Sequence, residues 1–474
     1  MRNSSCTSAW RKPVCVLFLF PLLFGCRTIP PAVSQSDDIM PHTRKKQDRN
    51  GEYSLESMVP GPIKVIELNA LPDADAIIPR LMDKQVVFIG ERHTRFADHL
   101  NQLAIIRGLY DRGKELAIGM EFFQQPFQPY LDAYSDKSIA GGPDDTALLS
   151  HTEYYDRWRY DYRLYQPILH FARKRRIPLI ALNISSEIVK KVSESGWDGL
   201  TGVESAEVPQ SIDRSNKRYE QRLRRIFRHH PRRQHPGHGT DKRTTVPTGN
   251  KRTGPHPVAA HGVHGKSGGH GARLSTDRAG GQRRTDFQRF MDVQLLWDEG
   301  MAERAAKYLT EHPGHTLVVL AGSGHLAYGH GIPDRVRRRV PVESAIILPV
   351  HDIANDDIAD DSGGDTESVP DNPSGIADFL LVSGDRALPP AGTLGILLET
   401  DAEGIRITSF TPQSPARDAG MEEGDRLVRI DLRPIETMAH VKLALWDKRP
   451  GDRVSVELHR IGGVKEMRLE VVLR

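Results

Sequence analysis

Residues 86–93 read VVFIGERH and residues 316–325 read TLVVLAGSGH, so one arrangement occurs twice in the chain. Each stretch is an unbroken apolar run followed by a glycine and, three residues later, a histidine. Such a run is typical of a strand buried on both faces, as in a parallel sheet. The polar residues after it then stand at the carboxyl end of the strand, where open parallel sheets collect their functional groups.

The surrounding sequence, residues 61–386, alternates apolar runs of strand length with amphipathic stretches of helical spacing. In chain order these runs and stretches are 86–90, 95–113, 115–123, 162–176, 178–185, 286–313, 316–322 and 343–350. Alternation of this kind predicts an α/β fold, with a mostly parallel sheet that carries helices on both faces.

The N-terminus predicts export and lipidation. Arg2, Arg11 and Lys12 precede the apolar run 14–25, which is too short to cross a bilayer and has the layout of a secretory signal. The run ends in LFGC, which resembles the lipobox of bacterial lipoproteins. The resemblance implies that Cys26 carries the lipid, including palmitate. An ordinary signal peptide or a short membrane anchor is the alternative.

The lipobox divides the N-terminal region into a signal peptide, residues 1–25, and a polar, Pro-containing tether, residues 26–60. It implies a lipid-anchored protein of the cell envelope. Arg27 is not the aspartate that commonly retains lipoproteins at the inner membrane, so we expect the outer membrane, facing the periplasm. Cys6 and Cys15 lie in the signal, and lipid would occupy the third cysteine. No thiol is left for a disulfide, a cysteine zinc site or a cysteine nucleophile.

Two segments interrupt the alternating pattern. Residues 228–285 hold eight of the 20 histidines and twelve Lys/Arg against two Asp, but a single Leu and no Ile, Phe, Met, Trp or Tyr. This composition cannot bury enough apolar area to order itself. A disordered insertion, a His-rich loop that binds metal or haem, and a compensated frameshift in GC-rich DNA are three open interpretations. Residues 351–375 form an acidic loop. We expect no nucleic-acid partner for the protein.

Residues 390–474 have a different character, that of a small β-rich domain. GTLGILLE (392–399) is a glycine-containing loop that leads into a strand, and SPARDAGMEEGDRLVRIDLRPI follows with an SPA…AG…GD…I pattern. The segment resembles a bacterial PDZ domain. The resemblance implies that Leu394, Gly395 and Ile396 hold the carboxylate of a peptide C-terminus through their backbone N–H groups. A domain that only caps or spaces the first is the alternative.

Polar residues follow four of the predicted strands and would meet at one edge of the sheet: Glu91 with His93, Glu121, Asn183 and His325. Two imidazoles and two carboxylates suit a divalent metal such as Zn²⁺ or Mn²⁺, with His93, Glu121 and His325 as ligands. They equally suit general acid–base chemistry, with Glu91 and Glu121 as the catalytic carboxylates. The structural alternative is a rim of mutually satisfied charges and helix caps.

The motifs GERH, GMEFF, EYYDRWRYDY…YQPIL, IALN, QLLWDEGMAE and LAGSGHLAYGHGIPDRV together resemble the ChaN-type lipoproteins. These belong to a superfamily with the Tiki, TraB and erythromycin-esterase proteins. The resemblance implies an α/β lipoprotein of iron and haem acquisition that forms a homodimer around haem. Tiki-type relatives imply instead a metal-dependent protease that uses both Gly-x-x-His motifs and a glutamate.

Haem binding requires an apolar slot, an axial Tyr or His, and cations for the propionates. Residues 153–167, EYYDRWRYDYRLYQP, concentrate aromatic residues and arginines. The predicted haem-binding residues are His93, His325, Tyr154, Tyr155, Tyr160 and Arg159. Packing of these aromatics against the sheet is the alternative. Asp298 and Glu299 either support the site or lie on an exposed helix face, and the exposed face is favoured for Glu299.

Two functions stay open. The first is a membrane-anchored lipoprotein that binds haem or iron for uptake and uses its PDZ domain for peptides or partners. The second is a metal-dependent hydrolase of the Tiki type. Whether the protein is an enzyme stays open with them. A scaffold with a decayed site is a third interpretation, against which the intact His93, Glu121 and His325 count.

Overall fold

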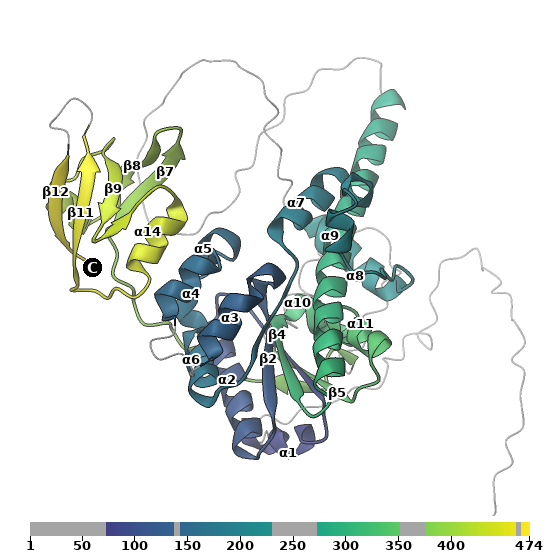
Figure 1. The fold of residues 1–474 in the computed structure, drawn as a ribbon. Coiled ribbons are helices and arrows are strands. Elements are labelled where there is room, and N and C mark those ends of the chain that lie inside the picture. The colour runs from purple at the N-terminus through teal and green to yellow at the C-terminus, as the bar shows by residue number, and fades with distance from the viewer. Residues whose placement is uncertain (1–72, 137–142, 230–272, 351–374, 461–465) are drawn as a thin grey trace, which may run out of the picture. The chain divides into compact units, whose positions relative to one another are not determined.

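The structure is a computed structural model that describes residues 73–136, 143–229, 273–350, 375–460 and 466–474 (Figure 1). The predicted signal peptide, the tether with Cys26 and nearly all of the acidic loop lie outside these ranges. The predicted insertion also lies mostly outside them, although helix α9 (Arg273–Glu311) begins within it. Within the described ranges, no helix is both long enough and apolar enough to cross a membrane.

The first sheet has six strands in the order β3-β2-β4-β1-β5-β6, and every pairing in it is parallel. The strands are β1 (Val86–Glu91), β2 (Leu116–Gln124), β3 (Leu179–Asn183), β4 (Thr316–Gly322), β5 (Ser344–Pro349) and β6 (Phe379–Leu381). Its central strands β1, β2 and β4 are buried along their whole length. The predicted α/β fold with a parallel sheet is confirmed.

Helices cover both faces of this sheet (Figure 1). The remaining α-helices are α1 (Ile78–Leu81), α2 (Phe96–Asp111), α3 (Gln128–Ser135), α4 (Asp145–His151), α5 (Tyr154–Arg157), α6 (Gln166–Arg175), α7 (Ser186–Ser195), α8 (Lys217–His229), α10 (Ser323–Leu326) and α11 (Ile332–Arg339). Short 3₁₀ helices occur at Ala74–Ile77, Gln125–Phe127, Tyr162–Leu164, Trp197–Gly199, Glu204–Ala206 and Ala327–Gly329.

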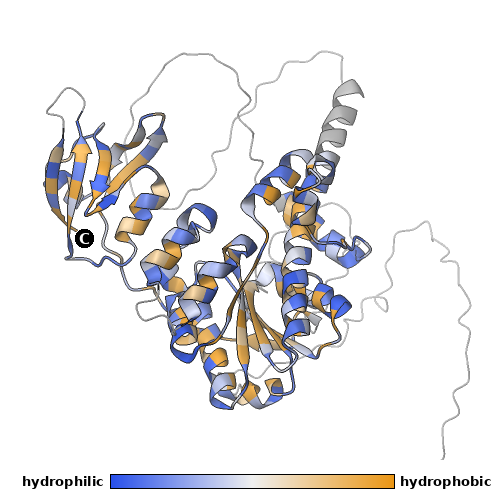
Figure 2. Ribbon diagram, viewed as in Figure 1, coloured by the Kyte–Doolittle hydropathy of each residue, from blue (hydrophilic) through white to orange (hydrophobic). Residues whose placement is uncertain are grey.

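The alternation of side chains along β1 divides the core into two layers. Val87 and Ile89 pack with residues of α2 and α6, whereas Val86 and Phe88 pack with residues of α9 and α11. A strand with apolar residues at every position satisfies both layers at once. Figure 2 shows these strands in orange between helices whose outer faces are largely blue.

The second sheet is antiparallel, in the order β12-β11-β9-β8-β7, with β10 paired to β9. Its elements are β7 (Ile396–Asp401), β8 (Gly404–Phe410), α13 (Pro415–Asp418), β9 (Arg426–Ile430), β10 (Arg433–Pro434), α14 (Met438–Leu445), β11 (Arg453–His459) and β12 (Met467–Val472). The predicted small β-rich domain is confirmed. Strand β7 lies at one edge of the described sheet, directly after the loop that contains Gly395.

A buried carboxylate joins three helices on the α2 and α6 side of the first sheet. Asp145 accepts hydrogen bonds from the hydroxyl of Tyr134 (2.7 Å) and Nε2 of Gln166 (2.9 Å), and it pairs with Nε2 of His170 (2.7 Å). Burial alone would raise the pKa of Asp145, but these partners outweigh it, His170 first, and bring the pKa down to about 2.

The free energy of unfolding of the first domain should therefore depend on pH, because Asp145 titrates at low pH. Because the folded-state pKa is depressed, the contribution is present above the unfolded value near 4 and is lost as the pH falls through about 2. Asp145→Asn should lower stability at neutral pH and flatten the loss between pH 4 and pH 2. Urea unfolding at pH 7, 4 and 2.5 measures both effects, and an identical acid profile in the variant would contradict the assignment.

Candidate functional site

The two Gly-x-x-His stretches meet because β1 and β4 are neighbours. Their register pairs Glu91 with Gly322, so both strands end at the same level. Strand β2 lies on the other side of β4 and brings Glu121 to the same edge. The structure therefore places His93, Glu121 and His325 together, although the chain separates the two histidines by more than two hundred residues.

A single buried carboxylate organises the β1 end of the site. The side chain of Glu91 is only 1% exposed, and its Oε1 lies 2.9 Å from Nδ1 of His93. Oε1 also accepts a hydrogen bond from the hydroxyl of Tyr165 (2.9 Å). Oε2 accepts one from Nε2 of Gln102 (2.8 Å) and lies 3.4 Å from Nδ1 of His99. Four polar side chains therefore surround this carboxylate.

The pKa values of Glu91 and His93 are shifted by the groups around them. Burial would raise the pKa of Glu91, but His99 and His93 outweigh it, and the pKa lies well below its usual range. Burial would lower the pKa of His93, but its hydrogen bond to Glu91 and the charge of Glu121 raise it. Nδ1 of His93 must donate to the carboxylate, which leaves Nε2 as the nitrogen that a ligand can reach.

Aromatic side chains flank His93. The ring of Trp158 meets His93 edge-on at 4.8 Å between centroids, and that of Tyr160 lies at 5.0 Å. Nε1 of Trp158 donates to the hydroxyl of Tyr165 (3.1 Å), which itself donates to Glu91. The aromatic wall and the imidazole are thus held by one hydrogen-bonded chain.

A cleft of about 300 Å³ lies beside His93. It is lined by Glu91, Arg92, His93, Arg222, Gly322, Ser323, Gly324, Ala327, Leu348 and Ile376. A Cβ at Gly322 would stand 3.1 Å from Nε2 of His93, so a glycine keeps this approach open. Arg222 reaches the cleft from α8 and donates to the backbone oxygen of Gly324 (2.8 Å). The lining combines two arginines with apolar side chains.

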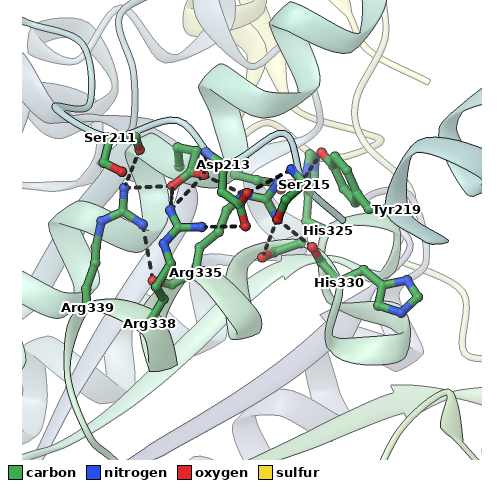
Figure 3. Close-up of polar contacts among 12 residues, drawn as sticks. Ser211, Asp213, Ser215, Tyr219, His325, His330, Arg335, Arg338 and Arg339 are labelled. Carbon is green, nitrogen blue, oxygen red and sulfur yellow. Dashed lines mark hydrogen bonds and ion pairs between the residues drawn. The ribbon is translucent and has the colours of Figure 1, made fainter. Parts of the chain in front are cut away.

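His325 is held on both sides. Its Nδ1 lies 2.6 Å from Oδ1 of Asp298, and its Nε2 lies 3.5 Å from Oε1 of Glu121. The other oxygen of Asp298 accepts from the hydroxyl of Tyr219 (2.6 Å; Figure 3). Burial would lower the pKa of His325, but Asp298 and Glu121 raise it to about 9. This imidazole is therefore charged at neutral pH.

Glu299 corrects a prediction: it lies not on an exposed helix face but fully inside the protein. Its carboxylate pairs with Arg335 (3.1 Å), Arg338 (2.7 Å) and Arg339 (2.6 Å) of α11. It also accepts from the backbone N–H of Asp213 (2.8 Å). Figure 3 shows this arginine cluster beside the network of His325. Adjacent residues of α9 therefore serve two purposes, because Asp298 holds His325 and Glu299 anchors α11.

Of the predicted haem-binding residues, Tyr154 and Tyr155 lie on α5. Tyr154 and Tyr155 are 1% and 8% exposed, and their rings meet at 5.2 Å in the core. Tyr154 packs on Phe123 and Tyr162 and on neither histidine. Arg159 is exposed and has a positive φ of 71°, which turns the chain after α5. Of the three tyrosines predicted to bind haem, Tyr160 is the one whose ring contacts His93.

The predicted metal site at His93, Glu121 and His325 is not preformed. Across the described ranges, no group of three or more His, Cys, Asp or Glu side chains has an arrangement that could hold a metal ion. Two of the three donors have other partners. Oε2 of Glu121 accepts from the backbone N–H of Gly322 (2.6 Å), and His325 is bound by two carboxylates.

Four residues of the site were not predicted from sequence: His99, Gln102, Tyr219 and Arg222. His99 and Gln102 lie one helical turn apart on α2 and could have been found as polar residues on its buried face. Tyr219 and Arg222 lie on α8, whose sequence is rich in arginine and resembles a solvated helix. Only the fold shows that these two point inward.

Comparisons with known proteins extend this description. A family model described as "Haem-binding uptake, Tiki superfamily, ChaN" matches residues 77–336, and a PDZ domain model matches residues 392–471. The chloroplastic protein RETICULATA-RELATED 5 of Arabidopsis thaliana is 27% identical over 138 residues. That match covers 27% of this chain and 18% of the plant protein, so the chain spans less than a fifth of this relative.

Solved structures match each part of the chain. ChaN of Campylobacter jejuni, described with cofacially bound haem, is 14% identical and matches 58% of this chain and 85% of its own, with a TM-score of 0.38. A serine endoprotease from Yersinia pestis is 25% identical and matches 18% of this chain and 28% of its own, with a TM-score of 0.16. Since the first family model covers more than half of its length, this chain belongs to the haem-binding uptake family of the Tiki superfamily, ChaN, and carries a PDZ domain after that family's domain.

Proposed function

We propose that this protein binds haem beside His93, at the cell envelope, for the uptake of haem or iron. One observation carries the proposal. The imidazole of His93 is 25% exposed, its Nδ1 is fixed by the buried Glu91, and its Nε2 is left for a ligand. A carboxylate on the far nitrogen is the usual support for an imidazole that binds a metal.

The residues around His93 have the chemistry that haem requires. Nε2 of His93 would bind the iron, and Trp158 and Tyr160 would pack on the porphyrin ring. Arg92 and Arg222 in the cleft would pair with the propionates. Haem is cargo in this proposal, so these residues have to hold it and release it.

A titration with ferric haem, followed in the Soret region, tests the proposal. The unsubstituted protein should show a saturable spectral change. His93→Ala should shift the band and weaken binding at least tenfold, because it removes a ligand worth more than about 1.4 kcal/mol. His170→Ala is the matched control, since His170 lies on α6 and pairs with Asp145. The proposal fails if haem leaves the spectrum unchanged, or if both variants bind as the parent does.

We further propose that Cys26 carries a lipid that anchors the protein at the outer membrane, facing the periplasm. The apolar run that ends in LFGC supports this. Cys26→Ser should move the protein from the membrane fraction to the soluble fraction of a bacterial host and abolish labelling with radioactive palmitate. Continued membrane association of the unlabelled variant would contradict lipid anchoring.

The PDZ domain is proposed to bind peptide C-termini along β7. In this mode, a strand adds to the sheet edge and backbone N–H groups of the loop at Leu394–Ile396 hold the carboxylate. Gly395 has a φ of +68°, and a Cβ there would lie 2.9 Å from Cα of Ser414. Gly395→Ala should therefore distort the loop by both strain and overlap.

Fluorescence polarisation with a C-terminal peptide library measures this binding. Gly395→Ala should weaken the best peptide at least fivefold, as should amidation of its C-terminus. Gly404→Ala is the matched control, because Gly404 also has a positive φ, of +119°, but a Cβ there meets nothing within 4 Å. Equal affinity for free and amidated peptides would rule out carboxylate recognition.

A further inference from the structure

We propose that the two Gly-x-x-His histidines have different roles, and that His325 is a positioning residue and not an iron ligand. The inference rests on the proposed haem-binding function and assigns the ligand role at this edge of the sheet to His93. His325 acts through Glu121, which it holds against the floor of the cleft.

Each ring nitrogen of His325 faces a carboxylate. Oδ1 of Asp298 lies 2.6 Å from Nδ1, and Oε1 of Glu121 lies 3.5 Å from Nε2. Asp298 cannot turn away easily, because its second oxygen accepts from Tyr219 of α8 (Figure 3). An imidazole can bind iron only through a nitrogen lone pair. His325 would have to give up a carboxylate partner to do so.

The side chain of His325 is only 14% exposed, and the chain packs against its backbone and against Asp298. A Cβ at Gly331 would stand 2.1 Å from the backbone oxygen of His325 and 3.0 Å from Oδ2 of Asp298, so the chain closes tightly over this pair. The ring of Trp297 lies edge-on to His325 at 6.1 Å. His93 differs from His325 in two ways. One of its ring nitrogens has no carboxylate partner, and a quarter of its side chain is exposed.

The contact from His325 reaches the cleft through Glu121. The second oxygen of Glu121 accepts from the backbone N–H of Gly322 at 2.6 Å. A Cβ at Gly322 would stand 3.1 Å from Nε2 of His93 and 3.6 Å from Oε2 of Glu121. The polar contacts that link Asp298, His325 and Glu121 therefore end at Gly322. This glycine lies against Nε2 of His93. Loss of His325 should let Glu121 move and change the space in front of His93.

A first test uses the haem-free protein. Diethyl pyrocarbonate modifies accessible imidazole nitrogens, and mass spectrometry of the digested protein gives the rate at each histidine. His93 should react at least tenfold faster than His325 in the unsubstituted protein. Asp298→Asn should raise the rate at His325, whereas Asp292→Asn, on the same helix but paired with Arg214, should not. Equal rates at His93 and His325 in the unsubstituted protein would overturn the proposal.

A second test uses the haem complex. His325→Gln should keep the Soret position and the spin state of the parent while weakening haem binding about fivefold. His93→Gln should change the position and the spin state. A band shift in His325→Gln equal to that in His93→Gln would overturn the assignment. If the unsubstituted protein binds no haem, the proposed function fails, and the labelling rates still decide which histidine is held on both sides.

Discussion

Replacing Glu299 by glutamine is expected to lower the free energy of unfolding by about 3–5 kcal/mol, because one partner of a buried ionic cluster is then removed. Glu299 is fully buried and faces Arg335, Arg338 and Arg339 of α11. A neutral amide would leave these guanidinium groups without their shared carboxylate. Its NH₂ group would also face donors, so at least one hydrogen bond would be lost outright.

Urea unfolding followed by circular dichroism measures this change. The matched control is Glu311→Gln, because Glu311 lies on the same helix α9 but is exposed and 3.9 Å from Lys307. An exposed pair of this kind contributes less than about 1 kcal/mol. The account of Glu299 as the anchor of α11 is wrong if the two variants lose the same small amount of stability.

Replacing Glu91 by glutamine should have the largest effect at the functional site. Glu91 is the shared partner of His93, His99, Tyr165 and Gln102. The amide would place an NH₂ group against one of their donors, at a cost of about 3 kcal/mol in stability. It would also remove the negative charge that raises the pKa of His93. We expect the pKa of His93 to fall. We also expect haem to bind more weakly, because the imidazole loses the carboxylate that orients it and increases its strength as a ligand.

Nuclear magnetic resonance of labelled histidine gives the pKa of His93 directly, and a haem titration gives the affinity. Glu187→Gln is the control, because Glu187 forms a surface ion pair with Arg157 and contacts neither His93 nor His99. A pKa of His93 that does not move in Glu91→Gln would show that this carboxylate does not set its protonation.

The convergence of the site could be predicted because it follows from strand periodicity. VVFIG and LVVLAG are apolar at every position, which indicates buried parallel strands, and neighbouring parallel strands end at one edge. Glu121 joins them for the same reason, at the end of another buried strand. The small β-rich second domain could be predicted because its glycine loop and its SPA…AG…GD…I pattern resemble those of PDZ domains.

The roles of individual side chains could not be predicted in the same way. Density of aromatic residues in 153–167 shows that rings gather, but not which of them face the core. Tyr154 and Tyr155 lie in the core, whereas Tyr160, after the turn at Arg159, lies against His93. The burial of Glu299 depends on arginines of another helix, and the local sequence of α9 contains no sign of them.

The most direct test is pulsed electron paramagnetic resonance of the ferric haem complex prepared with ¹⁵N-labelled histidine. The account predicts coupling between the iron and one histidine nitrogen that disappears in His93→Gln and persists in His325→Gln. Coupling that survives in His93→Gln would contradict it, as would iron that shows no histidine nitrogen in the unsubstituted protein.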